Sequence, residues 1–141
     1  MVAISIRGLD HVVIRASSLD RSLRFYCDVL GCVEVRRVDA IGLVQLRCGQ
    51  SMLDLVDVTG PIGEAGGAAA GEGGRNMDHF AVELAEFDEA KIRSHLEAHG
   101  VEPGEVAERN GAKGNGPSMY IRDPDDNVVE LKGYPEARCL P

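Results

Sequence analysis

Short alternations of apolar and polar residues cover most of the chain, and two stretches with helical periodicity interrupt them. This pattern predicts a strand, a helix and three further strands, in that order, in each half of the chain. In the first half the apolar positions with helical spacing are Leu19, Leu23, Tyr26 and Leu30. Ser18 precedes them and is expected to cap the helix, because its hydroxyl can accept a free backbone N–H. The later strands of this half are expected at residues 33–37, 43–47 and 52–56.

The second half repeats this order of elements. Leu9–Ile14 returns as Met77–Val82, and Ser51–Leu55 returns as Asn127–Leu131. Each predicted helix is followed by a glycine, the residue most often found just past a helix end. The second half is expected to contain a helix over residues 86–99 and strands over 106–109, 118–122 and 127–134. The chain therefore reads as a tandem duplication.

Glycine and alanine separate the two copies. Residues 60–74 contain seven glycines and four alanines, a composition that does not form a stable packed element. We expect a first module at 7–58, a Gly/Ala-rich linker at 59–76, a second module at 77–134 and a C-terminal tail at 135–141. A second glycine-rich stretch, 111–116, lies between expected strands and lacks the spacing of a phosphate-binding loop, so a nucleotide site is not expected.

Charge and composition narrow the possible partners. Fifteen basic and 23 acidic residues give a net charge of -8, and this field argues against binding to nucleic acid or to an anionic membrane. No apolar stretch approaches the ~20 residues of a membrane span, and the N-terminus lacks the pattern of a signal peptide, so we expect a cytoplasmic protein. The four cysteines form no CxxC pair and are expected to be reduced, structural thiols; they are Cys27, Cys32, Cys48 and Cys139.

Side chains alternate between the two faces of a strand, so the parity of each position predicts its face. His11 falls on the face opposite the apolar positions that should pack on the helix, and His79 takes the same place in the second half. Asp54 and Glu130 fall between apolar residues of the closing strands in the same way. Two imidazoles with carboxylates suit a divalent first-row metal ion. We therefore predict a metal site of His11, His79 and Glu130, with Asp54 as a further ligand, as the holder of a bound water or as a solvated residue.

The same alternation predicts the rest of a ligand cavity. A mostly apolar lining with a few polar groups is typical of a site for a small molecule. The residues expected to line this cavity are Val13, Val44, Leu46, Met52, Ala81, Ser118 and Tyr120. A small-molecule substrate is therefore the expected partner.

The motifs of both halves resemble the vicinal oxygen chelate superfamily, which includes glyoxalase I, extradiol dioxygenases, fosfomycin-resistance transferases and bleomycin-resistance proteins. The segments that carry the resemblance are Leu9–Val13, Ser22–Tyr26 with Leu30 and Gly31, Met77–His79 and Arg122–Leu131. The resemblance implies an α+β fold of two tandem βαβββ modules, which form a curved, mostly antiparallel sheet around a metal and ligand cavity. It also implies that His11, His79 and Glu130 match the ligand positions, that Asp54 takes the variable fourth position, and that the protein is a homodimer.

Residues 109–114 further resemble a glyoxalase-domain subgroup that has a similar loop before its Asp-Pro-Asp turn. Two positions depart from the superfamily pattern. Glyoxalase I members commonly have glutamate where this chain has Asp54, which should weaken or relocate the fourth ligand. Asp126 replaces the usual turn glycine, a change that mainly affects the geometry of the turn.

The resemblance implies several functions. The leading one is a glyoxalase I-like, metal-dependent lyase or isomerase that acts on a small bidentate substrate, for example a thiol conjugate. A divalent ion (Zn, Ni, Mn, Co or Fe) would stabilise charge on the substrate's adjacent oxygens, with Glu130 as general base and Asp54 as a second candidate. The alternatives are an extradiol-type dioxygenase, a fosfomycin-type thiol transferase using Ser118 and Tyr120, and a metal-free, resistance-type binding protein.

Overall fold

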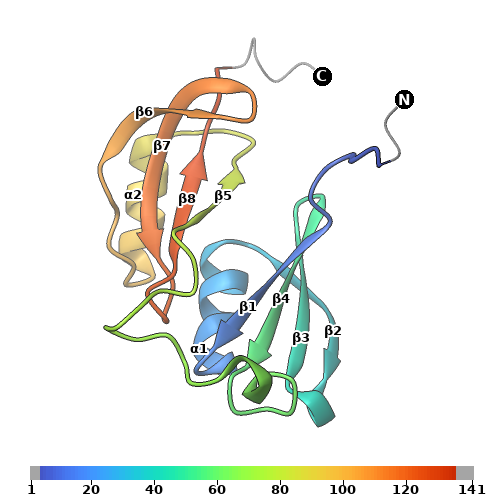
Figure 1. The fold of residues 1–141 in the computed structure, drawn as a ribbon. Coiled ribbons are helices and arrows are strands. Elements are labelled where there is room, and N and C mark those ends of the chain that lie inside the picture. The colour runs from blue at the N-terminus through green and yellow to red at the C-terminus, as the bar shows by residue number, and fades with distance from the viewer. Residues whose placement is uncertain (1–3, 136–141) are drawn as a thin grey trace. The chain divides into compact units, whose positions relative to one another are not determined.

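The structure, a computed structural model, describes residues 4–135. The chain forms two compact units, Met1–Ala69 and Ala70–Pro141, and each unit contains its own four-stranded sheet (Figure 1). The first module consists of β1 (His11–Ala16), α1 (Leu19–Leu23), β2 (Val33–Val38), β3 (Leu43–Cys48) and β4 (Ser51–Asp57). The second consists of β5 (Phe80–Glu83), α2 (Glu89–Ala98), β6 (Val106–Gly111), β7 (Gly114–Arg122) and β8 (Val128–Lys132). Most of the expected tail, and Cys139 with it, lies outside the described residues.

Both sheets have the same topology. The strand order is β1-β4-β3-β2 in the first and β5-β8-β7-β6 in the second. In each sheet one edge pair is parallel, β1 with β4 or β5 with β8, and the other two pairs are antiparallel. The predicted α+β fold of two βαβββ modules is therefore confirmed. The boundaries expected for the modules and the linker stay predictions.

The helix of the first module differs from the expected one. Its start is as predicted, because the Ser18 hydroxyl accepts a hydrogen bond from the Arg21 amide at 3.3 Å. After Leu23, however, the chain continues as a π-helix over Arg24–Val29. A π-helix closes its hydrogen bonds over five residues, so it turns more slowly and shifts the buried stripe. The side chains that α1 and the π-helix bury are Ser22, Phe25 and Tyr26, whereas Leu19, Leu23 and Leu30 are only half-buried.

The second module has a shorter helix than the sequence indicates. The Asp88 carboxylate accepts the Lys91 amide at 3.1 Å and caps α2, which begins at Glu89 rather than near 86. Leu96 is the buried residue of this helix. It belongs to a core with four strand residues, Met119, Ile121, Val129 and Leu131. Within residues 4–135, no helix is long and apolar enough to cross a bilayer.

The second glycine-rich stretch belongs to a hairpin rather than to an open loop. The ladder between β6 and β7 runs to the pair Gly111–Gly114, so only two residues form the turn. Gly114 has a φ of 99°, a backbone conformation that favours glycine. The hairpin thereby extends the ladder beyond the strands expected at 106–109 and 118–122.

Arg15 fastens the start of the glycine-rich segment to the first module. Its guanidinium donates hydrogen bonds to the carbonyls of Gly63 (3.0 Å) and Ala68 (3.1 Å), and also to the carbonyl of Gly67. A short 3-10 turn, Glu64–Gly66, lies between these acceptors. This part of the expected linker therefore has a defined backbone path.

Candidate functional site

The register of the first sheet gathers His11, Val13 and Asp54 on one face. His11 lies opposite Met52 and Val13 opposite Asp54 in the parallel β1–β4 ladder, so these four side chains point the same way. The other face packs on the helix and contains the fully buried Leu55. We call the face with the histidine and the carboxylate the ligand face of each module. The predicted placement of Val13 and Met52 on it is confirmed.

Asp54 is held in place from the neighbouring strand. Its side chain is 5% exposed, and its Oδ2 accepts a hydrogen bond from Gln45 Nε2 at 3.0 Å. Its Oδ1 is buried and has no hydrogen-bond partner among residues 4–135. Gln45 is a contact that the sequence analysis missed, and the signal for it was one polar residue between two apolar ones on β3. Asp54 is therefore an oriented carboxylate with one oxygen unused, not a solvated residue.

The sequence analysis assigned Val44 and Leu46 to the wrong face. Val44 pairs with Leu55 and Leu46 with Leu53, and both side chains are completely buried on the helix-covered face. Gln45, between them, lies opposite Asp54 on the ligand face. Parity along a single strand does not show how that strand is aligned with its neighbour, and a slip of one residue exchanges the faces. Leu46 is thus a core residue and does not line the ligand face.

A neighbouring aspartate holds the His11 ring. Nδ1 of His11 lies 2.7 Å from Oδ1 of Asp10. This hydrogen bond is the main reason why the pKa of His11 is raised above its usual value, and the charge of Asp54 adds to the effect. With Nδ1 occupied, Nε2 is the ring nitrogen left for a ligand. A carboxylate on the second nitrogen is the usual way in which proteins orient a metal-binding histidine.

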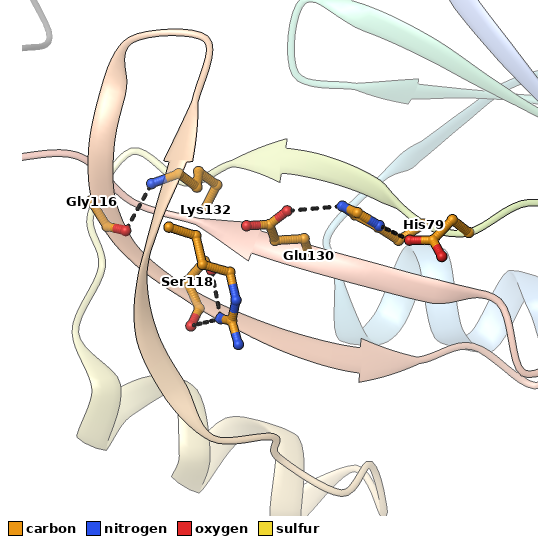
Figure 2. Close-up of polar contacts among 7 residues, drawn as sticks. His79, Gly116, Ser118, Glu130 and Lys132 are labelled. Atoms are coloured by element: carbon orange, nitrogen blue, oxygen red, sulfur yellow. Dashed lines mark hydrogen bonds and ion pairs between the residues drawn. The ribbon is translucent and has the colours of Figure 1, made fainter.

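The second module repeats this arrangement (Figure 2). Nδ1 of His79 lies 2.5 Å from Oδ2 of Asp78, and Nε2 lies 3.3 Å from Oε2 of Glu130. The Glu130 side chain is 8% exposed, and its Oε1 is buried without a hydrogen-bond partner in the described part of the chain. Glu130 pairs with Ala81 on β5 and with Tyr120 on β7, so all three lie on the ligand face. The predicted register of Tyr120 is confirmed.

These two carboxylates test whether a cation suits the chain. A buried carboxylate oxygen without a donor is unfavourable, because it has lost its hydration and gained nothing in return. Asp54 and Glu130 each have one such oxygen, at equivalent positions of the repeat. A divalent ion would satisfy an oxygen of this kind, and the imidazole and carboxylate donors are those that first-row ions prefer. Within residues 4–135, however, no three His, Cys, Asp or Glu side chains are gathered closely enough to hold a metal.

The ligand face of the second module also contains polar residues that the sequence analysis only partly foresaw. Ser118 lies on this face as expected, but its side chain is completely buried, and its hydroxyl accepts a hydrogen bond from Arg109 Nη1 at 2.8 Å. The Tyr120 ring packs edge-on against His79, with 5.3 Å between the ring centroids. Arg109 and Lys132 were missed, although both have the parity of this face. Lys132 lies two residues from Glu130 on β8, whereas only the cross-strand pairing brings Arg109 of β6 to the same region.

A tight turn before β8 fixes the approach to Glu130. The Asp123 carboxylate is buried and accepts the backbone amides of Asp125 and Asn127, each at 2.9 Å. Asp126 has a φ of 61°, the left-handed conformation in which glycine is usual. Aspartate tolerates this region better than most residues. The departure at Asp126 therefore leaves the turn intact.

Comparison with known proteins agrees with this architecture. "Glyoxalase domain-containing protein RDO1" of Mycosarcoma maydis is 28% identical to the chain, over 96% of this chain and 73% of that protein. "Virulence protein STM3117" of Salmonella typhimurium has a solved structure that matches 94% of this chain and 100% of its own, with 26% identity and a TM-score of 0.75. An integron cassette protein of V. cholerae, VCH_CASS1, matches with 25% identity and a TM-score of 0.75, over 95% of this chain and 100% of its own.

The sequence model of one family covers nearly all of both modules. It matches residues 8–131, a range that begins just before β1 and ends within β8. The range includes both histidines, both carboxylates and the turn before Glu130. The repeated sheets, the repeated histidine–carboxylate pairs and this match lead to one conclusion: the chain belongs to the Glyoxalase/Bleomycin resistance protein/Dioxygenase superfamily.

Proposed function

We propose that this protein is a metal-dependent enzyme with a glyoxalase I-like lyase or isomerase activity. The candidate ligands for its divalent ion are His11, Asp54, His79 and Glu130. The observation that carries the proposal is the pair of buried, unpartnered oxygens on Asp54 and Glu130. A metal-free binding protein would gain nothing from two such oxygens, each beside an oriented histidine.

Asp54 and Glu130 would have different roles in this reaction. A bound divalent ion would supply Lewis-acid stabilisation of negative charge on two adjacent oxygens of a small substrate. Asp54 is fixed by Gln45, so its remaining oxygen suits a permanent ligand. Glu130 is not fixed in this way, because among residues 4–135 its side chain has one polar neighbour, His79 Nε2 at 3.3 Å. Glu130 is therefore the better candidate to take up a substrate proton, on Oε1 or Oε2, and to return it.

The aspartates next to the histidines support this assignment. Asp10 and Asp78 hold the rings by Nδ1, which leaves Nε2 of each imidazole as the nitrogen that would bind the ion. Both aspartates are highly exposed, with relative exposures of 92% and 87%. They would orient the ligands and take no part in the proton transfer.

The alternatives differ in what they need from these residues. An extradiol-type dioxygenase would use the same two histidines and Glu130 with Fe(II), and Glu130 would need only to bind the metal. The thiol-transferase alternative relied on Ser118 and Tyr120. The buried Ser118 hydroxyl already binds Arg109, so it is not available to a substrate, and this alternative loses support.

Metal analysis of protein purified without a histidine tag tests the proposal first. We expect about one divalent ion per chain, and its loss in a His11→Gln, His79→Gln double variant. His95→Gln, a change on the exposed face of α2, is the matched control and should retain the metal. Turnover of a hemithioacetal should then be measured with each metal restored. Wild-type protein that stays metal-free after incubation with all five candidate ions would refute the proposal.

The role of Glu130 needs a separate assay. General-base catalysis typically contributes ~10²–10⁴-fold to a rate, so Glu130→Gln should lose turnover by that order even in the fraction that still binds metal. Asp54→Asn should lose less. Unchanged turnover per bound metal in Glu130→Gln would end the proton-transfer assignment and favour the dioxygenase.

The assembly is part of the proposal. We infer a homodimer, since the ladder of each sheet leaves β2 or β6 as an edge strand that pairs on one side only. Sedimentation at micromolar concentration tests it, and a single monomeric species would contradict it.

A further inference from the structure

Positively charged side chains follow Glu130 along the ligand face of the second module. Lys132 is two residues further along β8, on the same face. Arg109 lies on β6, opposite Gly116, and Lys132 also contacts Gly116. We call Arg109 and Lys132, together with Lys113 at the hairpin turn, the cationic end of this face. Its chemistry differs from that of the metal ligands at the other end.

Arg109 is positioned as a binding group and is not neutralised. Its Nη1 donates to the carbonyl (2.9 Å) and the hydroxyl (2.8 Å) of Ser118, and its guanidinium carbon lies 4.2 Å from the centroid of the Tyr120 ring. No acidic side chain in the described part of the chain forms an ion pair with it. Two anchored contacts and a ring stack fix the plane of the guanidinium, while Nε and Nη2 stay available. A planar group with free paired donors is the usual protein ligand for a carboxylate or phosphate.

Lys132 is a buried charge with neutral partners. Its side chain is 3% exposed, and its Nζ donates to the carbonyls of Gly116 (2.9 Å) and Gly133 (3.1 Å). Nζ also lies 4.3 Å from the centroid of the Tyr134 ring. These contacts satisfy its N–H groups but do not cancel its charge. A buried cation without a counter-ion is costly unless a ligand brings the opposite charge.

Two carboxylates lie nearby, Glu83 and Glu130, and Glu130 has His79 as its neighbour. Glu83 is the cross-strand neighbour of Lys132, but its Oε1 pairs with Lys113 Nζ at 2.7 Å. Three cations (Arg109, Lys113 and Lys132) and two carboxylates (Glu83 and Glu130) therefore leave an excess of one positive charge on this stretch of the face. This excess occurs in a chain whose net charge is -8, so it is a local feature and not a reflection of the composition.

We propose that the cationic end is a subsite for an anionic group of the substrate, a carboxylate or a phosphate. Arg109 binds this group directly, and Lys132 adds the charge that favours it. Two residues of a β-strand span about 7 Å, so the anion would bind roughly that far from the oxygens held at Glu130. The substrate class is then a small molecule with two adjacent oxygens at one end and an anionic group at the other. The part about adjacent oxygens rests on the proposed function, whereas the anion subsite does not.

The first experiment uses metal-free protein, so that it is independent of the metal site. Inorganic phosphate and glutarate are titrated, in separate samples, while the Nε–Hε signals of arginine are followed by NMR. We expect saturable binding of at least one of them, weakened about tenfold or more in Arg109→Met. Arg24→Met removes one exposed arginine from the other module and is the matched control, which should bind as wild type does. The stronger of the two probes shows whether the subsite prefers phosphate or carboxylate.

A variant that does not fold must be separated from one that does not bind. Thermal unfolding of Arg109→Met shows whether the fold is kept. If Arg109→Met does not fold, Arg109→Lys replaces it in the titrations. Lysine retains the charge but loses the planar stack and the paired donors, so the affinity of this variant for the anion should lie between those of wild type and a variant without the charge. Equal affinity of wild type and both Arg109 variants for phosphate and glutarate would overturn the proposal.

The second experiment adds the metal. In Mn(II)-loaded protein, 2-oxoglutarate and 2-oxobutyrate offer the same pair of adjacent oxygens, but only 2-oxoglutarate has a distal carboxylate. We expect wild type to bind 2-oxoglutarate about tenfold more tightly, and Arg109→Met to lose this preference while binding 2-oxobutyrate unchanged. Glu130→Gln should weaken both keto acids and leave phosphate binding intact. If phosphate binding depends on Arg109 but Mn(II) does not increase the affinity for either keto acid, only the proposed metal chemistry is refuted. If Mn(II) increases the affinity for both keto acids but 2-oxoglutarate binds no more tightly than 2-oxobutyrate, only the subsite is refuted.

A second inference has an independent basis in the first module, where two cysteines are cross-strand neighbours. Val33 pairs with Arg47 in the antiparallel β2–β3 ladder, which places Cys32, just before β2, next to Cys48 at the end of β3. Their thiols are joined by a hydrogen bond, which raises the pKa of Cys32 and lowers that of Cys48 to about 7. Cys32 is buried and Cys48 is half-buried, so Cys48 is the thiol that a small oxidant reaches.

We infer that Cys32 and Cys48 form a reversible disulfide on reaction with a hydroperoxide. The Cys48 thiolate attacks one peroxide oxygen and becomes a sulfenic acid, and the other oxygen leaves as water or alcohol after protonation. The Cys32 sulfur then attacks the Cys48 sulfur, and its proton leaves with the hydroxyl group as a second water. The thiols lose two electrons and two protons in total, and the peroxide is reduced. This modification differs from the structural, permanently reduced thiols that the sequence indicates.

Mass spectrometry after treatment with hydrogen peroxide tests the disulfide. We expect wild type and Cys27→Ser to lose two hydrogen atoms, with Cys32 linked to Cys48, and to regain them with dithiothreitol. Cys27 is a half-buried cysteine of the same module, and its burial raises its pKa, so this variant is the matched control. In Cys32→Ser, Cys48 should accumulate oxygen-containing products. In wild type, the alkylation of Cys48 by iodoacetamide should be half-maximal near pH 7. Oxidation of wild type without this link, or with Cys27 in it, would overturn the inference.

Discussion

Exchange of Glu130 for glutamine should change the stability of the protein in opposite directions with and without metal. In the metal-free protein the Glu130 side chain is 8% exposed, and its Oε1 has no donor among the described residues. Glutamine has nearly the same shape and no charge, so it is less costly to bury. Leaving a buried polar group unsatisfied typically costs about 1–3 kcal/mol, and the exchange should recover part of this. We expect Glu130→Gln to stabilise the metal-free protein by about 1 kcal/mol.

With metal bound, wild type should be more stable than Glu130→Gln, the reverse of the order expected without metal. An ion at 100 times its dissociation constant stabilises a folded protein by about 2.7 kcal/mol. If the loss of one carboxylate ligand weakens binding about 100-fold, the same concentration stabilises the variant by only about 0.4 kcal/mol. For a chain of this size, 1 kcal/mol shifts the unfolding temperature by roughly 2–4 °C or somewhat more. The variant should thus unfold a few degrees above wild type in EDTA and a few degrees below it in excess metal.

Differential scanning calorimetry in both conditions is the measurement, with the metal concentration fixed from a titration of wild type. Asp54→Asn is a useful companion, because its Oδ2 is satisfied by Gln45 and only Oδ1 lacks a donor. It should show the same reversal with a smaller amplitude. A Glu130→Gln protein that is less stable than wild type in EDTA and gains as much from metal would show that the buried oxygens are not a cation site.

Three further changes test other parts of the structure. Asp78→Asn removes the anion that holds Nδ1 of His79, so metal affinity should fall about 10–100-fold while the unfolding temperature in EDTA changes little; isothermal titration with metal measures it. Leu46→Ala should destabilise the protein by about 2–5 kcal/mol in urea unfolding without altering ligand affinity, because this side chain is completely buried on the helix-covered face. Gly116→Ala would bring a Cβ within 3.0 Å of Lys132 Nζ and against the carbonyl of Gly133. It should therefore destabilise the protein by about 1–3 kcal/mol in urea unfolding and weaken phosphate binding. Unchanged stability and unchanged phosphate affinity would contradict the position described for Lys132.

The sequence was sufficient wherever one strand or one repeat carried the signal. Asp54 could be assigned to a face because Leu53 and Leu55 flank it, and His11 because its parity differs from that of Val12 and Ile14. The duplication supplied His79 and Glu130 by analogy. The fold followed from the same repeated order of elements. Local patterns of this kind need no knowledge of which strands are paired.

The errors arose where two segments had to be aligned. Leu46 was assigned by its parity alone, and only the pairing of β3 with β4 shows that Gln45 takes the ligand face instead. Arg109 and Lys132 were overlooked because they are far apart in the sequence and approach the same glycine on β7. The π-helix over Arg24–Val29 changed the buried face of the first helix, and an apolar spacing read at 3.6 residues per turn does not reveal it.

Asp10 and Asp78 immediately precede the histidines whose rings they hold, so each orienting bond lies within two consecutive residues. The imidazole therefore needs no other strand to point it in the right direction. A gene duplication copies such a pair whole, and an exchange of modules between related chains leaves it working. The Asp54 carboxylate depends instead on Gln45, which a change elsewhere in the module can remove without touching Asp54 itself. After a duplication, the orientation of the histidine in each half is therefore easily retained, whereas the environment of the carboxylate can change through substitutions at other positions.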